Sequence, residues 1–391
     1  MVKTHGEFED PKSKKLINSN QLQIPLCSFC YDRNFSKNKM SLVKYTISVK
    51  IIKTGMKVCY ICRNFFLGTL PSIVDEISNS EMFKSTTCIL PVDIGTSLPF
   101  FFYENEDYLR SLFQIKGTIG IKTQTNLLIR EKIRKSKKCT IDHMNPELKF
   151  EVVIENDLSF NINCKAREFY LLGRYIKLDR GIAQKDKNWT KMNSQTFRKW
   201  IDRKDKSIEH SIRKSVWSEY NAEDIKITWT GSEDKYSLVL GSGRPFIVKV
   251  INPKTKGSDE KKVLEKDVEL YFRKIKHDEI DYYSKYRILV TIFVKLDEKV
   301  HDFDHFERLV QTLNGEVTFR VKNRKTTRNI YFAKLVSVEE DKLEISLDMD
   351  NGIPIKQFVG GNEPIEPCLS NTLETKCECI YFDINEVILN K

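Results

Sequence analysis

The segment Thr230–Phe246, TGSEDKYSLVLGSGRPF, decides the expected fold of the second half of the chain. It follows an alternating apolar stretch, 225–229, which predicts a strand. Within the segment we expect a polar loop that holds Asp234, and then short strands over 237–240 and 246–251 separated by a glycine-rich turn. The sequence here therefore predicts three strands joined by two loops, with one carboxylate in the first loop.

The second loop, Gly241-Ser242-Gly243, precedes Arg244. Glycine adopts positive φ at little cost, so two glycines around one serine suit a tight turn. Taken alone, Asp234 is best interpreted as an ordinary solvent-exposed turn residue, and an active-site loop is the alternative. These residues by themselves leave both interpretations open.

A second hairpin is predicted near the C-terminal end of the sequence. Apolar residues alternate with polar ones over 343–349, and Asn351-Gly352 is typical of a two-residue hairpin turn. With that turn, Lys356 shares a face with Leu347 and Met349, because cross-strand partners lie on the same side of a sheet. A lysine there is costly unless it meets a carboxylate or an anionic ligand. A loop of odd length would place Lys356 on the other face.

Two C-x2-C pairs, Cys27/Cys30 and Cys59/Cys62, predict a structural zinc site. Each pair places two thiolates on one tight turn, and four thiolates complete a tetrahedron. The alternative is four unrelated thiols among the ten cysteines of the chain. A structural zinc site stabilises the fold of the segment that carries it and need not contact a substrate.

Composition and charge indicate a soluble, intracellular protein with a polyanionic partner. The 391 residues include 65 Lys and Arg against 54 Asp and Glu, a net charge of +11. No apolar run approaches the roughly 20 residues of a membrane helix, and the polar N-terminal residues carry no secretory apolar region. We therefore expect no membrane association and reduced cysteines.

The pattern along the chain predicts an α+β protein with three parts. Residues 1–75 read as a polar tail followed by the zinc knuckle, and residues 76–171 mix helix and strand signals. This middle part contains the most basic run of the chain, Arg130–Lys138, which fits a solvated helix end as well as a binding site. Strand signals dominate residues 172–391.

Several motifs together resemble one family of tRNA pseudouridine synthases, the archaeal and animal family that modifies uridines 54 and 55 of the T-loop. The segment 172–184, LGRYIKLDRGIAQ, followed by Trp189, is similar to its G-R-Y-x-K-x-x-R-x-x-x-Q. The segment 231–234, GSED, resembles its G-R-E-D, and 240–246, LGSGRPF, its L-G-x-G-R-P-F. Lys356 with Gly360-Gly361-Asn362 resembles its Y-I-K-E-x-x-x-G-D.

The resemblance implies an isomerase that acts on tRNA without an organic cofactor, and Asp234 as its catalytic carboxylate. It implies a mixed β-sheet catalytic domain over 172–391, preceded by the zinc knuckle and a THUMP-like RNA-binding region over 76–171, in a chain that we expect to be monomeric. It also implies that Tyr286 packs against the flipped uracil, although an ordinary strand tyrosine fits the sequence almost as well. The implied substrate-binding residues are Tyr286, Lys356, Arg244, Arg174, Tyr175, Lys177 and Arg180.

The chain departs from the family pattern beside the expected catalytic residue. The arginine of G-R-E-D is Ser232 here, and the acidic residue two positions after the aspartate is Tyr236. Loss of that arginine removes charge expected to orient the carboxylate or to hold phosphate. Two alternatives to an active synthase therefore stay open: a tRNA-binding protein of this family that has lost catalysis, and an unrelated zinc-containing nucleic-acid binder.

Overall fold

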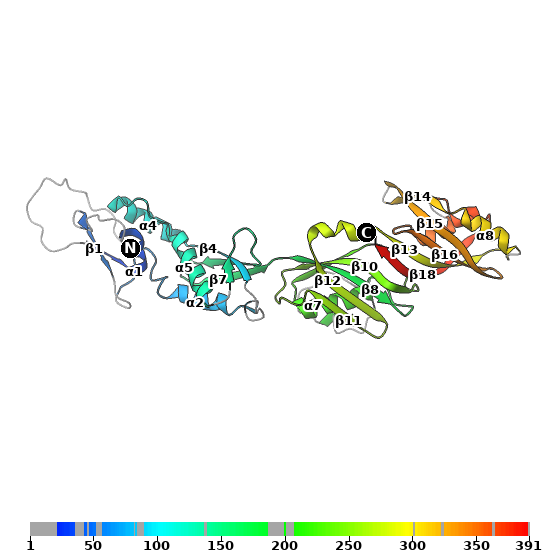
Figure 1. The fold of residues 1–391 in the computed structure, drawn as a ribbon. Helices are drawn as coiled ribbons and strands as arrows, with labels where there is room; N and C mark the ends of the chain where they lie inside the picture. Colours follow the sequence, from blue (N-terminus) through cyan, green and yellow to red (C-terminus); the bar gives the residue numbers. More distant parts are fainter. Residues whose placement is uncertain are drawn as a thin grey trace, which may run out of the picture. The chain divides into compact units, whose positions relative to one another are not determined.

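The computed structural model describes residues 22–35, 43–44, 47–51, 57–81, 83, 90–136, 139–186, 199–200, 207–299, 302–321, 324–361 and 364–389. Most of the expected N-terminal tail, Trp189 and Asn362 lie outside the described residues. The chain forms two compact units, Met1–Arg167 and Glu168–Lys391, which Figure 1 colours from blue to green and from green to red. The division of the chain into parts of 1–75, 76–171 and 172–391 stays a prediction.

The first unit contains two sheets and four described helices. The small sheet has the order β1-β3-β2, from Leu22–Leu26, Ile47–Ile51 and Val43–Lys44. The larger sheet has the order β5-β4-β6-β7, from Cys139–Ile141, Leu90–Ser97, Leu148–Ile154 and Phe160–Ala166. The helices are α1 (Ser28–Phe35), α2 (Thr69–Ser78), α4 (Phe100–Phe113) and α5 (Ile121–Ser136). One apolar core joins the cysteine-bearing segments to the larger sheet, so these segments pack as one unit.

The second unit is built on one large mixed sheet. Its order is β11-β12-β8-β10-β18-β13-β16-β15-β14-β17, and β9 also pairs with β10. The strands are β8 (Phe169–Lys177), β9 (Asp224–Trp229), β10 (Val239–Ile251), β11 (Glu260–Leu264), β12 (Val268–Ile275), β13 (Tyr286–Leu296), β14 (Gly315–Val321), β15 (Arg324–Glu339), β16 (Lys342–Asp350), β17 (Ile365–Glu366) and β18 (Cys377–Leu389). β10 and β18 run parallel, whereas the other neighbours are antiparallel. The predicted α+β class with a mixed sheet is confirmed.

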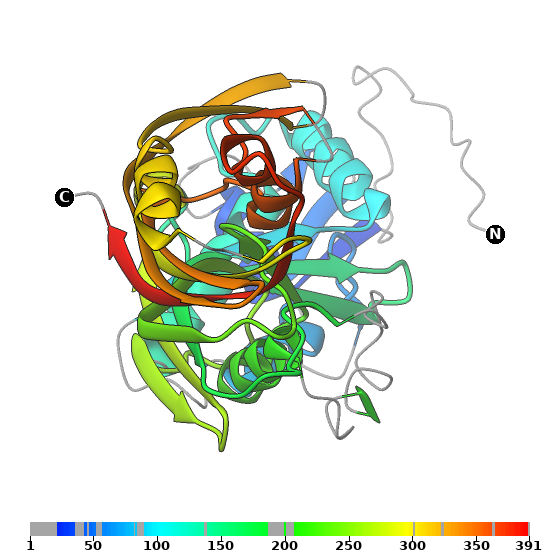
Figure 2. The same ribbon diagram turned by 90° about the vertical axis from the view of Figure 1, so that its right-hand side faces the viewer.

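Helices cover one face of this sheet because its strands bury every second residue, as β13 and β16 do. Figure 2 shows the curved part of the sheet wrapped around α8 (Phe303–Gln311), α9 (Ile355–Gly360) and α10 (Leu369–Thr372). The longer helix α7 (Ile208–Tyr220) packs into the same core beside β8 and β9. Two 3-10 helices, His277–Glu279 and Asp281–Ser284, lead into β13.

Residues 239–240 and 246–251 of the two expected strands belong to one continuous strand, β10, so the prediction of two separate strands was wrong. The pairing register jumps from Val239↔Lys177 to Arg244↔Tyr175, so five steps along β10 oppose two steps along β8. Gly241 and Gly243 have φ of 59° and 79°. Their positive φ was predicted, but it forms a wide bulge inside one strand and not a turn between two.

The predicted hairpin at Asn351-Gly352 was also wrong. β16 ends at Asp350, and the chain continues into the short helix α9 in place of a returning strand. Two residues mark the ends of this helix: Pro354 stands at its N-cap, and Gly361, with φ of 67°, ends it. Lys356 therefore reaches its site from the first turn of a helix.

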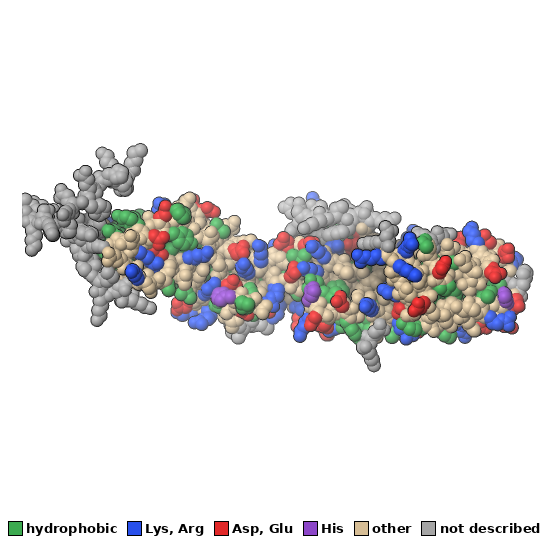
Figure 3. Space-filling model, turned by 90° about the horizontal axis from the view of Figure 1, so that it is seen from above, with side chains coloured by type: hydrophobic (Ala, Val, Ile, Leu, Met, Phe, Trp, Pro, Cys, Tyr) green, Lys and Arg blue, Asp and Glu red, His purple; other side chains and the backbone are tan. Residues whose placement is uncertain are grey.

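Charges of both signs are interspersed on the described surface visible in Figure 3, so the net charge of +11 is not gathered in one patch on that face. Within the described ranges, no helix combines the length and apolar character needed to cross a bilayer.

Candidate functional site

Asp234 lies in the loop that joins β9 to β10, at a pocket of about 360 Å³. Its side chain is 22% exposed, so the carboxylate is shielded but accessible. The pocket combines the backbone of this loop with the start of α9 and with apolar side chains of β13 and β18. It is lined by Gly231, Ser232, Glu233, Asp234, Arg244, Ile288, Gly352, Ile353, Pro354, Ile355, Lys356, Gln357, Phe382 and Ile384.

Two donors hold the Asp234 carboxylate. Lys356 Nζ donates to Oδ2 at 2.6 Å, and the backbone N–H of Tyr236 donates to Oδ1 at 2.9 Å. Partial burial raises the pKa of Asp234, but these two hydrogen bonds outweigh it and leave the pKa below its usual value. The carboxylate is therefore ionised at neutral pH and faces the pocket with its orientation fixed.

A buried ion pair lies directly behind the loop. Lys177 and Glu233 have no exposed side-chain surface, and Lys177 Nζ lies 3.3 Å from Glu233 Oε1. Lys177 also donates to the backbone carbonyl oxygens of Asp234 and Ile182, each at 3.1 Å. Burial lowers the pKa of Lys177, and the charge of Glu233 opposes that effect. Lys177 thus holds the backbone of the loop from inside the core.

Glu233 collects further donors on its other oxygen. Tyr175 donates its hydroxyl to Oε2 at 2.6 Å, and Arg244 Nη1 lies 3.5 Å from the same atom. Gln184 donates to Tyr175 at 3.0 Å and to the carbonyl oxygen of Gly231 at 3.0 Å. Because a buried carboxylate without partners is costly, this network fixes one position of the loop.

Tyr286 supports the other end of the loop. Its hydroxyl lies 2.9 Å from Thr230 Oγ1, and Arg244 donates to it at 3.4 Å. Arg244 also donates to the carbonyl oxygen of Ser232 at 3.0 Å. Tyr286 is only 1% exposed and is not among the residues that line the pocket.

The structure separates the predicted site residues into three groups. Asp234, Lys356 and Arg244 line the pocket. Tyr175, Lys177 and Tyr286 are buried beside it, and their expected contact with substrate stays a prediction. Arg180 pairs with Asp383 from β18, and Arg174 lines a different hollow with Lys262 and Arg273.

Two residues of the site were not predicted from the sequence. Glu233 precedes Asp234 in the matched GSED motif, and this adjacency was its only signal, because the burial of Lys177 and Arg244 that demands a counter-charge is visible only in the fold. Asp383 had no comparable signal, because it follows a strand-like run far from the motifs. Its role depends on which strands become neighbours in the sheet.

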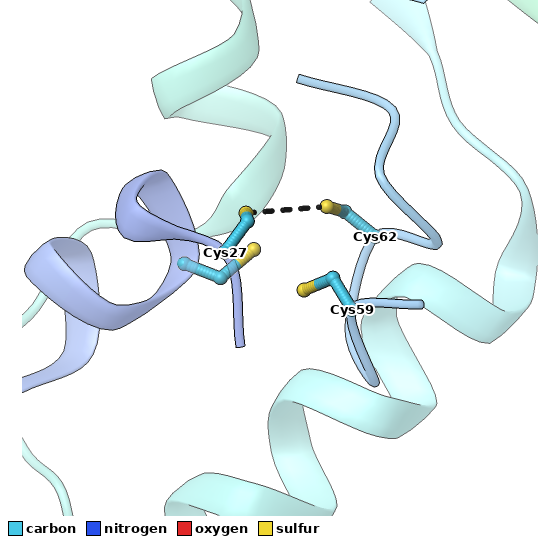
Figure 4. Close-up of side chains that lie close together, drawn as sticks. Cys27, Cys59 and Cys62 are labelled. Carbon is cyan, nitrogen blue, oxygen red and sulfur yellow. Dashed lines mark hydrogen bonds between the residues drawn. The ribbon is translucent and has the colours of Figure 1, made fainter. Parts of the chain in front are cut away.

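The four predicted zinc ligands come together in the first unit. The Sγ atoms of Cys27, Cys30, Cys59 and Cys62 lie within 4.8 Å of one another, and all four residues are buried. Cys27 follows β1, Cys30 lies in α1, and the other pair lies in the turns before α2. Figure 4 shows Cys27 and Cys62 facing each other, with 3.6 Å between their sulfur atoms.

This spacing fits zinc. Tetrahedral Zn–S bonds of about 2.3 Å give S–S edges of about 3.8 Å. The hydrogen bonds among the four thiols lower the pKa of Cys27 and Cys59 and raise the pKa of Cys30 and Cys62. Arg33 donates to Cys30 Sγ at 3.8 Å and to Glu106 Oε1 at 2.7 Å, which ties the cluster to α4. The arrangement can hold a metal ion in the manner of a structural zinc site.

A family model and several relatives of this chain point to the same protein family. A family model described as "Pus10, C-terminal" matches residues 170–388, more than half of the chain. The tRNA pseudouridine synthase Pus10 of Nitrosopumilus maritimus is 26% identical over 381 residues, which cover 94% of this chain and 97% of that protein. The proteins of the same name from Cenarchaeum symbiosum and Methanosphaera stadtmanae are 25% and 23% identical, over 85% and 96% of this chain and 82% and 99% of theirs.

Among solved structures, a Cbf5-Nop10-Gar1 complex matches with a TM-score of 0.30 and 12% identity, over 55% of this chain and 48% of that one. This likeness is too low to support a conclusion about the fold.

Proposed function

This chain belongs to the Pus10 family, and from that membership we infer that it is a tRNA pseudouridine synthase whose catalytic carboxylate is Asp234. One observation supports the assignment of Asp234: within the region that the family model matches, this residue is an ionised, lysine-paired carboxylate at a pocket of about 360 Å³. The expected isomerase activity agrees with the names of the archaeal relatives.

The proposed reaction rearranges one uridine and needs no oxidant or organic cofactor. The C1′–N1 glycosidic bond breaks, the uracil rotates, and a C1′–C5 bond forms. The hydrogen of C5 leaves as a proton, and N1 gains one. Asp234 acts at the ribose, either by covalent attack on C1′ or as a base, and both roles require the ionised carboxylate found here.

The pocket suits a single extruded base. An enzyme that acts on a base must take it out of its stack and bind it between apolar surfaces. Ile288, Phe382 and Ile384 supply such apolar side chains beside the polar loop. We propose that they pack against the faces of the uracil while Asp234 meets the sugar. The two roles need adjacent apolar and charged walls, which the pocket has.

The remaining predicted residues receive different proposed roles. Tyr175, Lys177 and Tyr286 are proposed to hold the loop, because their buried side chains contact its backbone or Glu233. Arg174 remains a candidate for contact with tRNA phosphates on a separate surface. The targets are proposed to be T-loop uridines 54 and 55, on the strength of the motif resemblance. The THUMP-like region is proposed to bind tRNA, and zinc to act structurally at the four cysteines.

The test is incubation of the full chain with an unmodified tRNA transcript, followed by chemical mapping of pseudouridine. We expect pseudouridine in the T-loop with the unmutated protein, and none with Asp234→Asn, which keeps tRNA binding. Asp179→Asn, an exposed acid in a neighbouring motif, is the matched control and should retain activity. Tight tRNA binding without any product from the unmutated protein favours the non-catalytic alternative. Turnover by Asp234→Asn would exclude Asp234 as the essential group.

A further inference from the structure

We propose that Arg180 and Asp383 form one positioning device for the catalytic loop, an inference that rests on the proposed function. The two residues lie 203 positions apart in the sequence. Arg180 Nη1 and Nη2 donate to Asp383 Oδ1 and Oδ2 at 2.7 and 2.6 Å. Such a bidentate pair fixes both the distance and the plane of the two groups.

Both partners also bind the loop directly. Arg180 donates to the backbone carbonyl oxygen of Tyr236, and Asp383 Oδ1 accepts the N–H of Leu238 at 2.8 Å. Next to them, the N–H of Gly181 donates to the carbonyl oxygen of Lys235 at 2.8 Å. The three residues that these bonds hold, Lys235, Tyr236 and Leu238, follow Asp234 in the chain.

The contacts continue to the catalytic carboxylate. The N–H of Tyr236 donates to Asp234 Oδ1 at 2.9 Å, so one residue is held by Arg180 through its oxygen and holds Asp234 through its nitrogen. A shift of the Arg180–Asp383 pair must therefore reach the Asp234 carboxylate through a single residue.

The strand that carries Asp383 also supplies apolar side chains to the pocket. Phe382 and Ile384 of β18 line the pocket, and Asp383 lies between them. Neighbouring residues of a strand point to opposite faces, so Asp383 can bind the loop while Phe382 and Ile384 face the pocket proposed for the uracil. The pair therefore sets the distance between the carboxylate and the apolar wall, which the reaction needs to keep constant.

Arg180 is not a free cation for RNA in this arrangement. Besides its ion pair, its guanidinium lies 4.1 Å from the centre of the Tyr381 ring. The sequence resemblance implied direct substrate binding by Arg180, whereas the contacts assign it a positioning role. The two roles predict different kinetic effects.

The experiment measures kcat and KM for uridine isomerisation, together with tRNA affinity, in Asp383→Asn, Arg180→Lys and the double variant of the full chain. A small displacement of a catalytic group costs up to about 100-fold in rate. We expect each single variant to lower kcat about 10- to 100-fold, with KM and tRNA affinity changed by less than about threefold. The double variant should be no slower than the worse single variant, because the two residues act as a unit.

A second ion pair of the same unit is a matched control. Arg287 pairs with Asp348, the side chains are 33% and 14% exposed against 35% and 11% for Arg180 and Asp383, and Arg287 lies 4.2 Å from the Tyr331 ring. Neither Asp348 nor Tyr331 belongs to the loop at 234–238. Arg287→Lys and Asp348→Asn should therefore leave kcat within about twofold of the unmutated value.

Two results would overturn the proposal. The first is weaker tRNA binding and a smaller salt dependence in Arg180→Lys with no effect of Asp383→Asn, which would make Arg180 a phosphate contact. The second is a rate loss in the double variant equal to the product of the single losses. If Asp383→Asn does not fold, Arg180→Lys with an unchanged melting temperature decides the question.

If the unmutated protein makes no pseudouridine, the proposed function fails but the positioning device is still testable. Amide hydrogen exchange then reports on the loop. The device predicts that Asp383→Asn, and not Asp348→Asn, accelerates exchange at Leu238. Equal exchange in both variants would refute it.

Discussion

Replacement of Lys356 by methionine should move the acidic limb of the pH–rate profile to higher pH. In the proposed reaction Asp234 must be ionised, so activity is expected to fall as the pH drops through its pKa. That pKa lies below the usual value because the hydrogen bonds from Lys356 and the Tyr236 N–H outweigh partial burial. Without the ammonium group the pKa rises, and activity is lost at a higher pH than in the unmutated protein.

The size of the shift follows from the geometry. Lys356 Nζ and Asp234 Oδ2 are 2.6 Å apart, and the lysine side chain is 54% exposed. For such an exposed pair the dielectric constant of water is the appropriate limit, and two unit charges at this distance then interact by about 1.6 kcal/mol before screening. Salt and the entropy of ordering the lysine reduce exposed pairs to about 0.2 to 1 kcal/mol. One pKa unit corresponds to about 1.4 kcal/mol, so the limb should shift by about half a pH unit.

The assay is release of tritium from tRNA labelled at uridine C5, measured between about pH 4 and pH 8. Lys235→Met is the matched control, because Lys235 is an exposed neighbour whose ammonium lies over the Tyr236 ring and not on the carboxylate. Its limb should shift by less than about 0.3 unit, and Lys356→Arg should retain most of the unmutated profile. An unmoved limb in Lys356→Met, or equal shifts in both methionine variants, would refute this role of the lysine.

Two further predictions concern stability. Glu233→Gln should lower the free energy of unfolding of the second unit by about 3 kcal/mol, because it leaves the buried charges of Lys177 and Arg244 without a counter-charge. Urea unfolding measures this free energy, and a loss below about 1 kcal/mol would contradict a stabilising role for the Glu233 network. Removal of metal by a chelator, or Cys59→Ser, should abolish cooperative unfolding of the first unit and leave the unfolding transition of the second unit in place. The reason is that the four thiols lie in the core of the first unit only. Calorimetry with a zinc-release dye checks this, and two unchanged transitions would contradict a structural metal.

Local features of the site were predictable because they depend on local chemistry. Glycine at 241 and 243 indicated positive φ, and the two C-x2-C pairs indicated a cluster of four thiols. Alternation in 343–349 indicated a half-buried strand. These signals rest on one residue type or on one period, and both are visible in a short window.

The larger structures around these local features depend on distant partners. The bulge of β10 is defined by its register against β8, and the helix after Gly352 depends on the weak signals of Pro354 and Gly361. The hydrophobic pattern alone could not reveal that Lys356 meets Asp234, because 122 positions separate them. Lys356 was expected to need an anion, and it has one, although through a helix and not the predicted hairpin.

The place of β18 has a consequence for how the enzyme is made. This strand, the last one described, lies between β10 and β13 in the sheet. The part of the sheet that follows the Asp234 loop, β10, is therefore connected to β13 only after residues 377–389 have left the ribosome. A nascent chain halted at residue 376 already carries Asp234, the proposed catalytic residue, and Lys356, yet has neither Phe382 nor Asp383 to complete the pocket. Premature termination there should yield an inert polypeptide with an open sheet edge, a substrate for proteolysis rather than a slow catalyst.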